Sequence, residues 1–237
     1  MEDGIATLAL NTSLAALQAY EWAWGIDQDV FNEYVASYAN VNEGRTNIRP
    51  LLAEAVGAMI DAAQERPTDI EGIVTLINSN MWKEETNNLG KTVVFKGSQT
   101  PLIYDPMSTL VYGFASCTGV SILFVDALRS VGVPARVAGT PAWNDVYENG
   151  NHNWIEVYNG GEWQFLEAAP AGGGETLANP CDKWFCSPAK MANGTTFFSA
   201  RWDKSQGTVY PMAWDLDNSE VPGDDRTEYY QAACGQC

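Results

Sequence analysis

The stretch that decides the fold is Phe114-Ala115-Ser116-Cys117-Thr118-Gly119-Val120-Ser121-Ile122-Leu123-Phe124-Val125-Asp126-Ala127-Leu128-Arg129. Its largely apolar run predicts a buried helix over residues 116–131. Ser116 is a favoured N-cap residue, so the sulfur of Cys117 is expected in the first turn, at the positive end of the helix dipole. That position lowers the pKa of a thiol. Cys117 is therefore the candidate nucleophile, although a lone cysteine on an apolar helix is more often a small core residue.

Two strands joined by a tight turn are expected further along the chain. They cover residues 153–158 and 163–167, and Asn159-Gly160-Gly161-Glu162 forms the turn between them. His152, the single histidine of the sequence, stands at the start of one strand, and Glu167 stands at the end of its partner. The hairpin therefore predicts that the two side chains lie close together. A thiol, an imidazole and a carboxylate are the nucleophile, the base and the orienting group of a catalytic triad.

Each member of this trio also has a structural interpretation. A lone histidine is more often structural than catalytic, and a glutamate at a strand end is commonly just solvated. Two other side chains could orient His152 in place of Glu167. Glu156 shares a strand face with His152, because the two are four residues apart at a period of two. Asn153 is the other alternative, so the third role stays open.

Composition bounds the class of protein. Apolar residues make up 46% of the 237 residues and charged residues 18%, which is typical of a globular chain. The net charge of −17 repels phosphate backbones, so we expect no nucleic-acid partner. No apolar run approaches the length that crosses a bilayer, so we expect no membrane-spanning segment.

The remaining segments are expected to cover or extend the core of an α+β protein. We divide the chain into a helical N-terminal extension over residues 1–72, a core over 73–205 and an acidic, cysteine-containing tail over 206–237. Within these parts we expect helices over 6–20, 30–38, 48–63 and 70–82, strands over 92–95 and 135–139, a loop over 101–112 and a loop-like tail over 211–237.

Three blocks of sequence resemble the transglutaminase-like superfamily. Cys117-Thr118-Gly119, followed by Leu128-Arg129-Ser130-Val131-Gly132-Val133-Pro134-Ala135-Arg136-Val137, resembles its cysteine segment. His152-Asn153-Trp154-Ile155-Glu156-Val157-Tyr158 is similar to its histidine strand, and Trp163-Gln164-Phe165-Leu166-Glu167 to its acidic strand. The blocks occur in the family order, and the resemblance covers about residues 75–205. The departure is Glu167, where the family usually has Asp.

The resemblance implies a papain-like fold, in which the cysteine helix packs on an antiparallel sheet. It also implies a cysteine acyltransferase, peptidase or amidase that acts on a protein or peptide substrate through a thioester. The oxyanion donors would be the backbone N–H of Cys117 and the indole of Trp82, for which a packing role is the alternative. No cofactor is implied, and no EF-hand pattern suggests calcium. Two other functions remain: a non-catalytic binding or scaffold protein, and deglycosylation of the peptide N-glycanase kind.

Four further cysteines lie in the C-terminal third: Cys181, Cys186, Cys234 and Cys237. We expect two disulfides among them, which leaves Cys117 as the free thiol. A four-cysteine zinc site is the alternative. Disulfides indicate an oxidising compartment, so we expect a secreted or extracytoplasmic protein, although the N-terminus lacks the basic segment of a signal peptide.

Overall fold

The computed structural model describes residues 2–172, 176–177, 186–191, 194–205 and 208–234. The helices are α1 (Glu2–Ala19), α2 (Gln28–Tyr34), α3 (Arg49–Ala62), α4 (Ile70–Asn80), α5 (Glu84–Asn87), α6 (Pro106–Tyr112), α7 (Cys117–Ser130), α8 (Pro188–Met191) and α9 (Thr227–Cys234). The strands are β1 (Val94–Phe95), β2 (Phe114–Ala115), β3 (Ala135–Thr140), β4 (His152–Asn159), β5 (Glu162–Leu166), β6 (Phe198–Ala200) and β7 (Gly223–Asp225). Short 3-10 turns are η1 (Glu21–Ala23), η2 (Trp143–Asp145), η3 (Tyr147–Asn149) and η4 (Ala169–Ala171).

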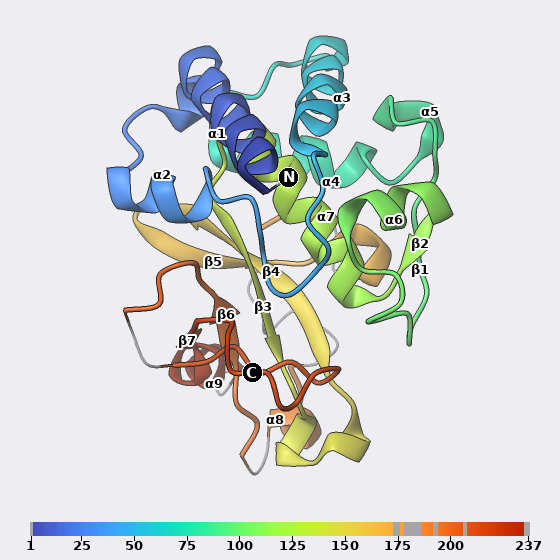
Figure 1. Cartoon of the computed structure of the whole chain (residues 1–237), viewed down its shortest axis with the longest axis vertical. Helices are drawn as coiled ribbons and strands as arrows, with labels where there is room; N and C mark the ends of the chain where they lie inside the picture. Colours follow the sequence, from blue (N-terminus) through green and yellow to red (C-terminus); the bar gives the residue numbers. More distant parts are fainter. Residues whose placement is uncertain (1, 173–175, 178–185, 192–193, 206–207, 235–237) are drawn as a thin grey trace.

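Helix α7 is the centre of the molecule. All 14 of its residues are buried. It packs against α1, α3, α4 and α6, and against strands β3 and β4. Figure 1 shows α7 near the middle of the cartoon, with the N-terminal helices beside it and the C-terminal elements α9, β6 and β7 at the opposite end. The buried helix predicted over 116–131 is confirmed.

The main sheet is antiparallel, with the strand order β5-β4-β3-β6-β7. Alternate residues of its strands face opposite sides, as the pleat requires. Ile155 and Leu166 belong to the large core that contains α7, whereas Trp154 and Phe165 belong to a second cluster with Tyr230 of α9. The sheet is thus buried on both faces. The α+β class and the expected hairpin are confirmed, with Asn159 opposite Glu162 beside the turn.

Two expectations from the sequence are wrong. The segment 101–112 contains helix α6, whose N-cap is Asp105: its side chain accepts a 2.9 Å hydrogen bond from the N–H of Ser108. Pro106 begins this helix, and Gly113 ends it with φ 72°. The loop-like tail contains strand β7, which pairs with β6, and helix α9. The boundary between core and tail stays a prediction, although the pairing of β7 joins the tail to the main sheet.

One disulfide, Cys186–Cys234, joins the segment before α8 to the end of α9. It accounts for one of the two bridges that the sequence predicts. Cys181 and Cys237 lie outside the described residues. Within the described part of the chain, no helix is long and apolar enough to cross a membrane.

The carboxylate of Glu156 is buried on the face of the sheet that packs against α9. Glu156 of β4 is fully buried, and both of its oxygens are bound. Oε2 accepts hydrogen bonds from Arg136 Nε at 2.9 Å and from Ser199 Oγ at 2.7 Å. Oε1 accepts from Arg226 Nε and from the Tyr230 hydroxyl, both at 2.9 Å. Burial raises the pKa of Glu156, but the charges of the two arginines outweigh it and hold the pKa below its ordinary value.

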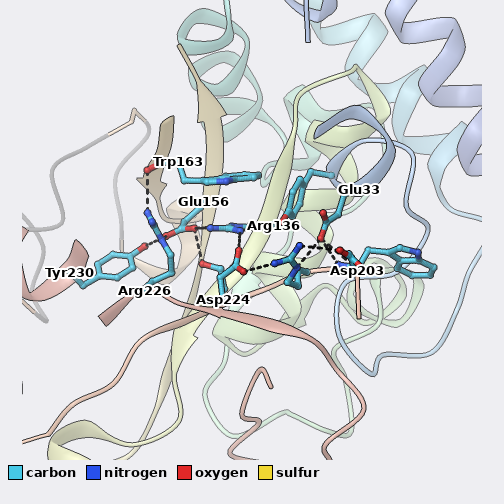
Figure 2. A network of polar contacts seen from close by, with 12 residues as sticks. Glu33, Arg136, Glu156, Trp163, Asp203, Asp224, Arg226 and Tyr230 are labelled. Atoms are coloured by element: carbon cyan, nitrogen blue, oxygen red, sulfur yellow. Dashed lines mark hydrogen bonds and ion pairs between the residues drawn. The ribbon is translucent and has the colours of Figure 1, made fainter. Parts of the chain in front are cut away.

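The network extends from Glu156 toward the N-terminal helices (Figure 2). Arg136 lies between Glu156 and Asp224, which it binds at 2.6 Å, and its guanidinium stacks 4.0 Å from the ring centre of Trp163. Asp224 also binds Arg201 at 2.8 Å, and Arg201 reaches Glu33 of α2 at 3.3 Å. The network therefore ties α2, β3, β4, β7 and α9 together.

We expect Glu156→Gln to lower the free energy of unfolding by about 3–5 kcal/mol, because it leaves the buried guanidinium of Arg136 and the partly buried one of Arg226 short of their counter-charge. Urea denaturation near neutral pH measures this loss. The same contribution should fade as pH falls through the lowered pKa of Glu156, since the folded state then has to protonate the carboxylate.

The matched control is Glu220→Gln. Glu220 pairs with Lys204 at 3.5 Å, but the two side chains are 80% and 69% exposed, so its loss should change stability by less than about 0.5 kcal/mol. Equal effects of the two substitutions would contradict a structural role for the Glu156 network.

Candidate active site

The sulfur of Cys117 lies at the start of the central helix. Cys117 is the first residue of α7, it is a free thiol, and it is 9% exposed. The first N–H groups of a helix have no partner within the helix, so they are available to a group at this position. Ser116 occupies the N-cap position as expected, but its hydroxyl bonds Thr100 Oγ1 at 2.5 Å and does not cap the helix.

His152 is the first residue of β4 and is 5% exposed. Its Nε2 hydrogen-bonds Oε1 of Glu167, and its side chain also hydrogen-bonds the thiol of Cys117. Since Nε2 faces the carboxylate, Nδ1 is the ring nitrogen left for the sulfur. The structure therefore brings Cys117, His152 and Glu167 together in the order sulfur, imidazole, carboxylate. Their catalytic role stays a prediction.

Glu167 follows directly after β5 and is 1% exposed. Asn78 of α4 holds its backbone: Asn78 Nδ2 donates to the carbonyl of Glu167 at 2.9 Å, and Asn78 Oδ1 accepts from the N–H of Ala169 at 2.9 Å. Sequence reasoning did not find Asn78. The signal was a polar residue on the inner face of an apolar helix, because a buried amide needs partners.

Charge and hydrogen bonding tune the thiol and the imidazole toward an ion pair. Burial raises the pKa of Cys117, but the hydrogen bond and charge of His152, with backbone hydrogen bonds from Asn153 and Thr118, bring it below its ordinary value. Burial lowers the pKa of His152, but Cys117 and Glu167 outweigh it and raise the pKa to about 9. Both shifts favour the thiolate and imidazolium forms of the pair, the state in which a cysteine is a strong nucleophile.

The pair opens into a cavity of about 680 Å³. Cys117 and His152 both line it. The walls come from five segments of the chain, at residues 95–101, 116–118, 150–152, 171 and 213–214. Its other lining residues are Phe95, Gly97, Ser98, Thr100, Pro101, Ser116, Thr118, Gly150, Asn151, Ala171, Ala213 and Trp214.

The structure separates the remaining candidates from this cavity. The indole N–H of Trp82 donates to Asn78 Oδ1 at 2.9 Å, and its ring packs edge-on against Phe124, so it has the packing role rather than that of an oxyanion donor. Both carboxylate oxygens of Glu156 are bound by other partners, Arg136 and Arg226 among them, and Asn153 bonds Thr118 and Tyr210. Neither alternative orients His152 in this structure, and Glu167 does.

Comparison with known proteins finds one family model and a distant structural neighbour. A family model of the transglutaminase-like superfamily matches residues 76–168. A solved structure of a protein from Cytophaga hutchinsonii, proposed to be a cysteine protease, is similar with a TM-score of 0.43 and 15% identity, covering 88% of this chain and 68% of that chain. No curated protein matches the sequence. The family match supports the papain-like fold expected above and, more generally, a cysteine-dependent enzyme.

We expect Glu167→Gln to lower the pKa of His152 from about 9 by about one unit or more, because the carboxylate favours the charged imidazolium. The sequence has a single histidine, so its ring proton signal in a one-dimensional NMR titration reports this pKa directly. Glu148→Gln, at an exposed position of η3, is the matched control and should leave the midpoint unchanged. An unchanged midpoint in Glu167→Gln would remove Glu167 from the proposed trio.

Proposed function

We propose that this protein is a cysteine-dependent acyl enzyme with Cys117, His152 and Glu167 as its catalytic triad, and the match of residues 76–168 to the transglutaminase-like superfamily supports this. The observation that supports this most strongly is the thiol and imidazole pair at the wall of a cavity, with a buried carboxylate behind the imidazole. A scaffold protein has no need to lower the pKa of the free, buried thiol of Cys117.

The reaction follows from the protonation states of the pair. The Cys117 thiolate attacks the carbonyl carbon of a carboxamide or peptide, and the carbonyl π electrons move onto its oxygen. The oxyanion then collapses, the C–N bond breaks, and the His152 imidazolium gives its proton to the departing amine. A thioester remains on Cys117, and His152 is now neutral.

The second half of the reaction reverses these roles. Neutral His152 takes a proton from water or from an amine, which attacks the thioester carbonyl. The C–S bond breaks, and the thiolate and imidazolium are restored. Glu167 keeps the imidazole in one orientation and stabilises its charged form throughout. The N–H groups at the start of α7, that of Cys117 among them, are the donors we propose for the oxyanion.

The substrate we propose is a protein or peptide that presents an uncharged amide. The cavity volume of about 680 Å³ suits a side chain or a short peptide segment. We further propose that the protein works outside the cytoplasm, and the Cys186–Cys234 disulfide supports this location.

We expect iodoacetamide to label Cys117 rapidly near pH 6, and His152→Ala to slow this labelling by about tenfold or more, because the imidazolium stabilises the thiolate. Mass spectrometry of the digested protein assigns the label to Cys117. His152→Ala should also return the midpoint of the pH profile toward the ordinary thiol value. Slow labelling of equal rate in both proteins would favour the scaffold function.

The acyl acceptor is decided by a second assay. The protein is incubated with a glutamine-containing protein and a fluorescent amine, and amine incorporation, ammonia release and chain cleavage are scored together. Cys117→Ala is the blank. Incorporation identifies a crosslinking enzyme, ammonia release alone an amidase, and cleavage a peptidase. Absence of all three in a protein that labels rapidly would contradict the proposed substrate class.

A further inference from the structure

A chain of three buried polar side chains lies behind the Cys117 and His152 pair. The hydroxyl of Tyr210 donates to Asn153 Oδ1 at 2.6 Å, and Asn153 Nδ2 donates to Thr118 Oγ1 at 2.9 Å. The three residues are 1%, 4% and 1% exposed. Each hydrogen bond is formed away from water, where an unpaired partner would be costly.

The chain joins the two segments that carry the reactive pair. Thr118 follows Cys117 in the first turn of α7, and Asn153 follows His152 at the start of β4. The backbone groups of these two residues also hydrogen-bond the sulfur of Cys117 and favour its charged form. The side-chain hydrogen bond between Asn153 and Thr118 thus joins the two residues whose backbone N–H groups face the sulfur.

A glycine makes room for this arrangement. Gly139 of β3 stands directly opposite Asn153 in the strand register. A Cβ atom at this position would lie 2.5 Å from Asn153 Oδ1 and 3.0 Å from the Tyr210 hydroxyl. The Cβ would also lie 2.5 Å from the backbone carbonyl of His152, so the glycine leaves room both for the Tyr210–Asn153 contact and for the start of β4.

We propose that Tyr210 is a positioning residue for the nucleophile: through Asn153 and Thr118 it holds two backbone N–H groups against the Cys117 sulfur. The proposal rests on Cys117 being the nucleophile of the proposed function. Burial raises the pKa of Tyr210 far above its ordinary value, so its hydroxyl remains a donor at every working pH. Tyr210 lies outside the matched residues 76–168, so the C-terminal segment completes the site.

The test is the pH dependence of Cys117 alkylation in Tyr210→Phe. The change removes one hydroxyl, keeps the ring, and should raise the midpoint by about half a unit to one unit, since hydrogen bonds to a charged form lower its pKa. The rate near pH 6 should fall about three- to tenfold. The titratable groups that face the sulfur are His152, backed by Glu167, and Tyr210, so the His152 midpoint is recorded by NMR in the same variants.

A second pair of variants, at Thr118, distinguishes a change in thiol reactivity from a general loss of stability. Thr118→Val keeps the shape of the side chain but loses the oxygen that accepts from Asn153, and it should raise the midpoint as Tyr210→Phe does. Thr118→Ser keeps the oxygen, so the midpoint of its pH profile should lie below that of Thr118→Val. Tyr147→Phe, at a position 55% exposed, is the matched control for loss of a tyrosine hydroxyl.

The outcomes separate this proposal from the proposed function. A lower melting temperature with an unmoved midpoint in both Tyr210→Phe and Thr118→Val would show a purely structural role and overturn the proposal. A higher midpoint in both, with the midpoint of Thr118→Ser below that of Thr118→Val, supports it. The absolute reactivity of the unchanged protein tests Cys117 as the nucleophile, whereas only the differences between variants test Tyr210.

Discussion

The complete burial of α7 is the constraint on which the rest of the structure depends. A helix with all 14 residues buried must be covered on every side. The sheet covers one side, and α1, α3, α4 and α6 cover others. The cavity reaches this helix at its first turn, through Ser116, Cys117 and Thr118. Cys117 is therefore placed where the orphan N–H groups of the helix start meet the substrate space.

The same burial explains why the N-terminal helices are needed. Asp126 and Arg129 of α7 are charged residues inside the core, and burial raises the pKa of Asp126 to about 6. Arg49 of α3 lies 3.9 Å from Asp126, while Arg129 donates to the side chain of Ser37 at 2.9 Å and to the carbonyl of Ala39 at 3.0 Å. The N-terminal segment thus supplies the partners that buried charges require, besides apolar cover.

Features set by a local sequence pattern could be predicted, whereas those set by contacts between distant residues could not. The helix of Cys117 and the hairpin that brings His152 to Glu167 follow from apolar runs and one tight turn, so both could be predicted. The helix from Pro106 to Tyr112 carried its own signal, an Asp N-cap, a proline at the first position and a glycine after the end, which was not recognised. Asn78 and Tyr210 could not be placed, because their partners lie 89 and 57 residues away. The choice between the oxyanion and packing roles of Trp82 could not be made for the same reason, since only the fold shows that Asn78 accepts its indole N–H.

The contacts around Glu167 give a physical reason for a glutamate at the position where the family usually has an aspartate. The family resemblance leads to an aspartate there, and a glutamate is longer by one methylene, about 1.5 Å. The backbone of Glu167 is fixed on α4, because Asn78 binds both its carbonyl and the N–H of Ala169. The imidazole is fixed independently, at the first residue of β4. Because the backbones of Glu167 and His152 are both held, the distance between them sets how long the acidic side chain must be to reach the imidazole. The glutamate is therefore matched to the position of α4, and the helix that precedes the cysteine segment takes part in orienting the histidine.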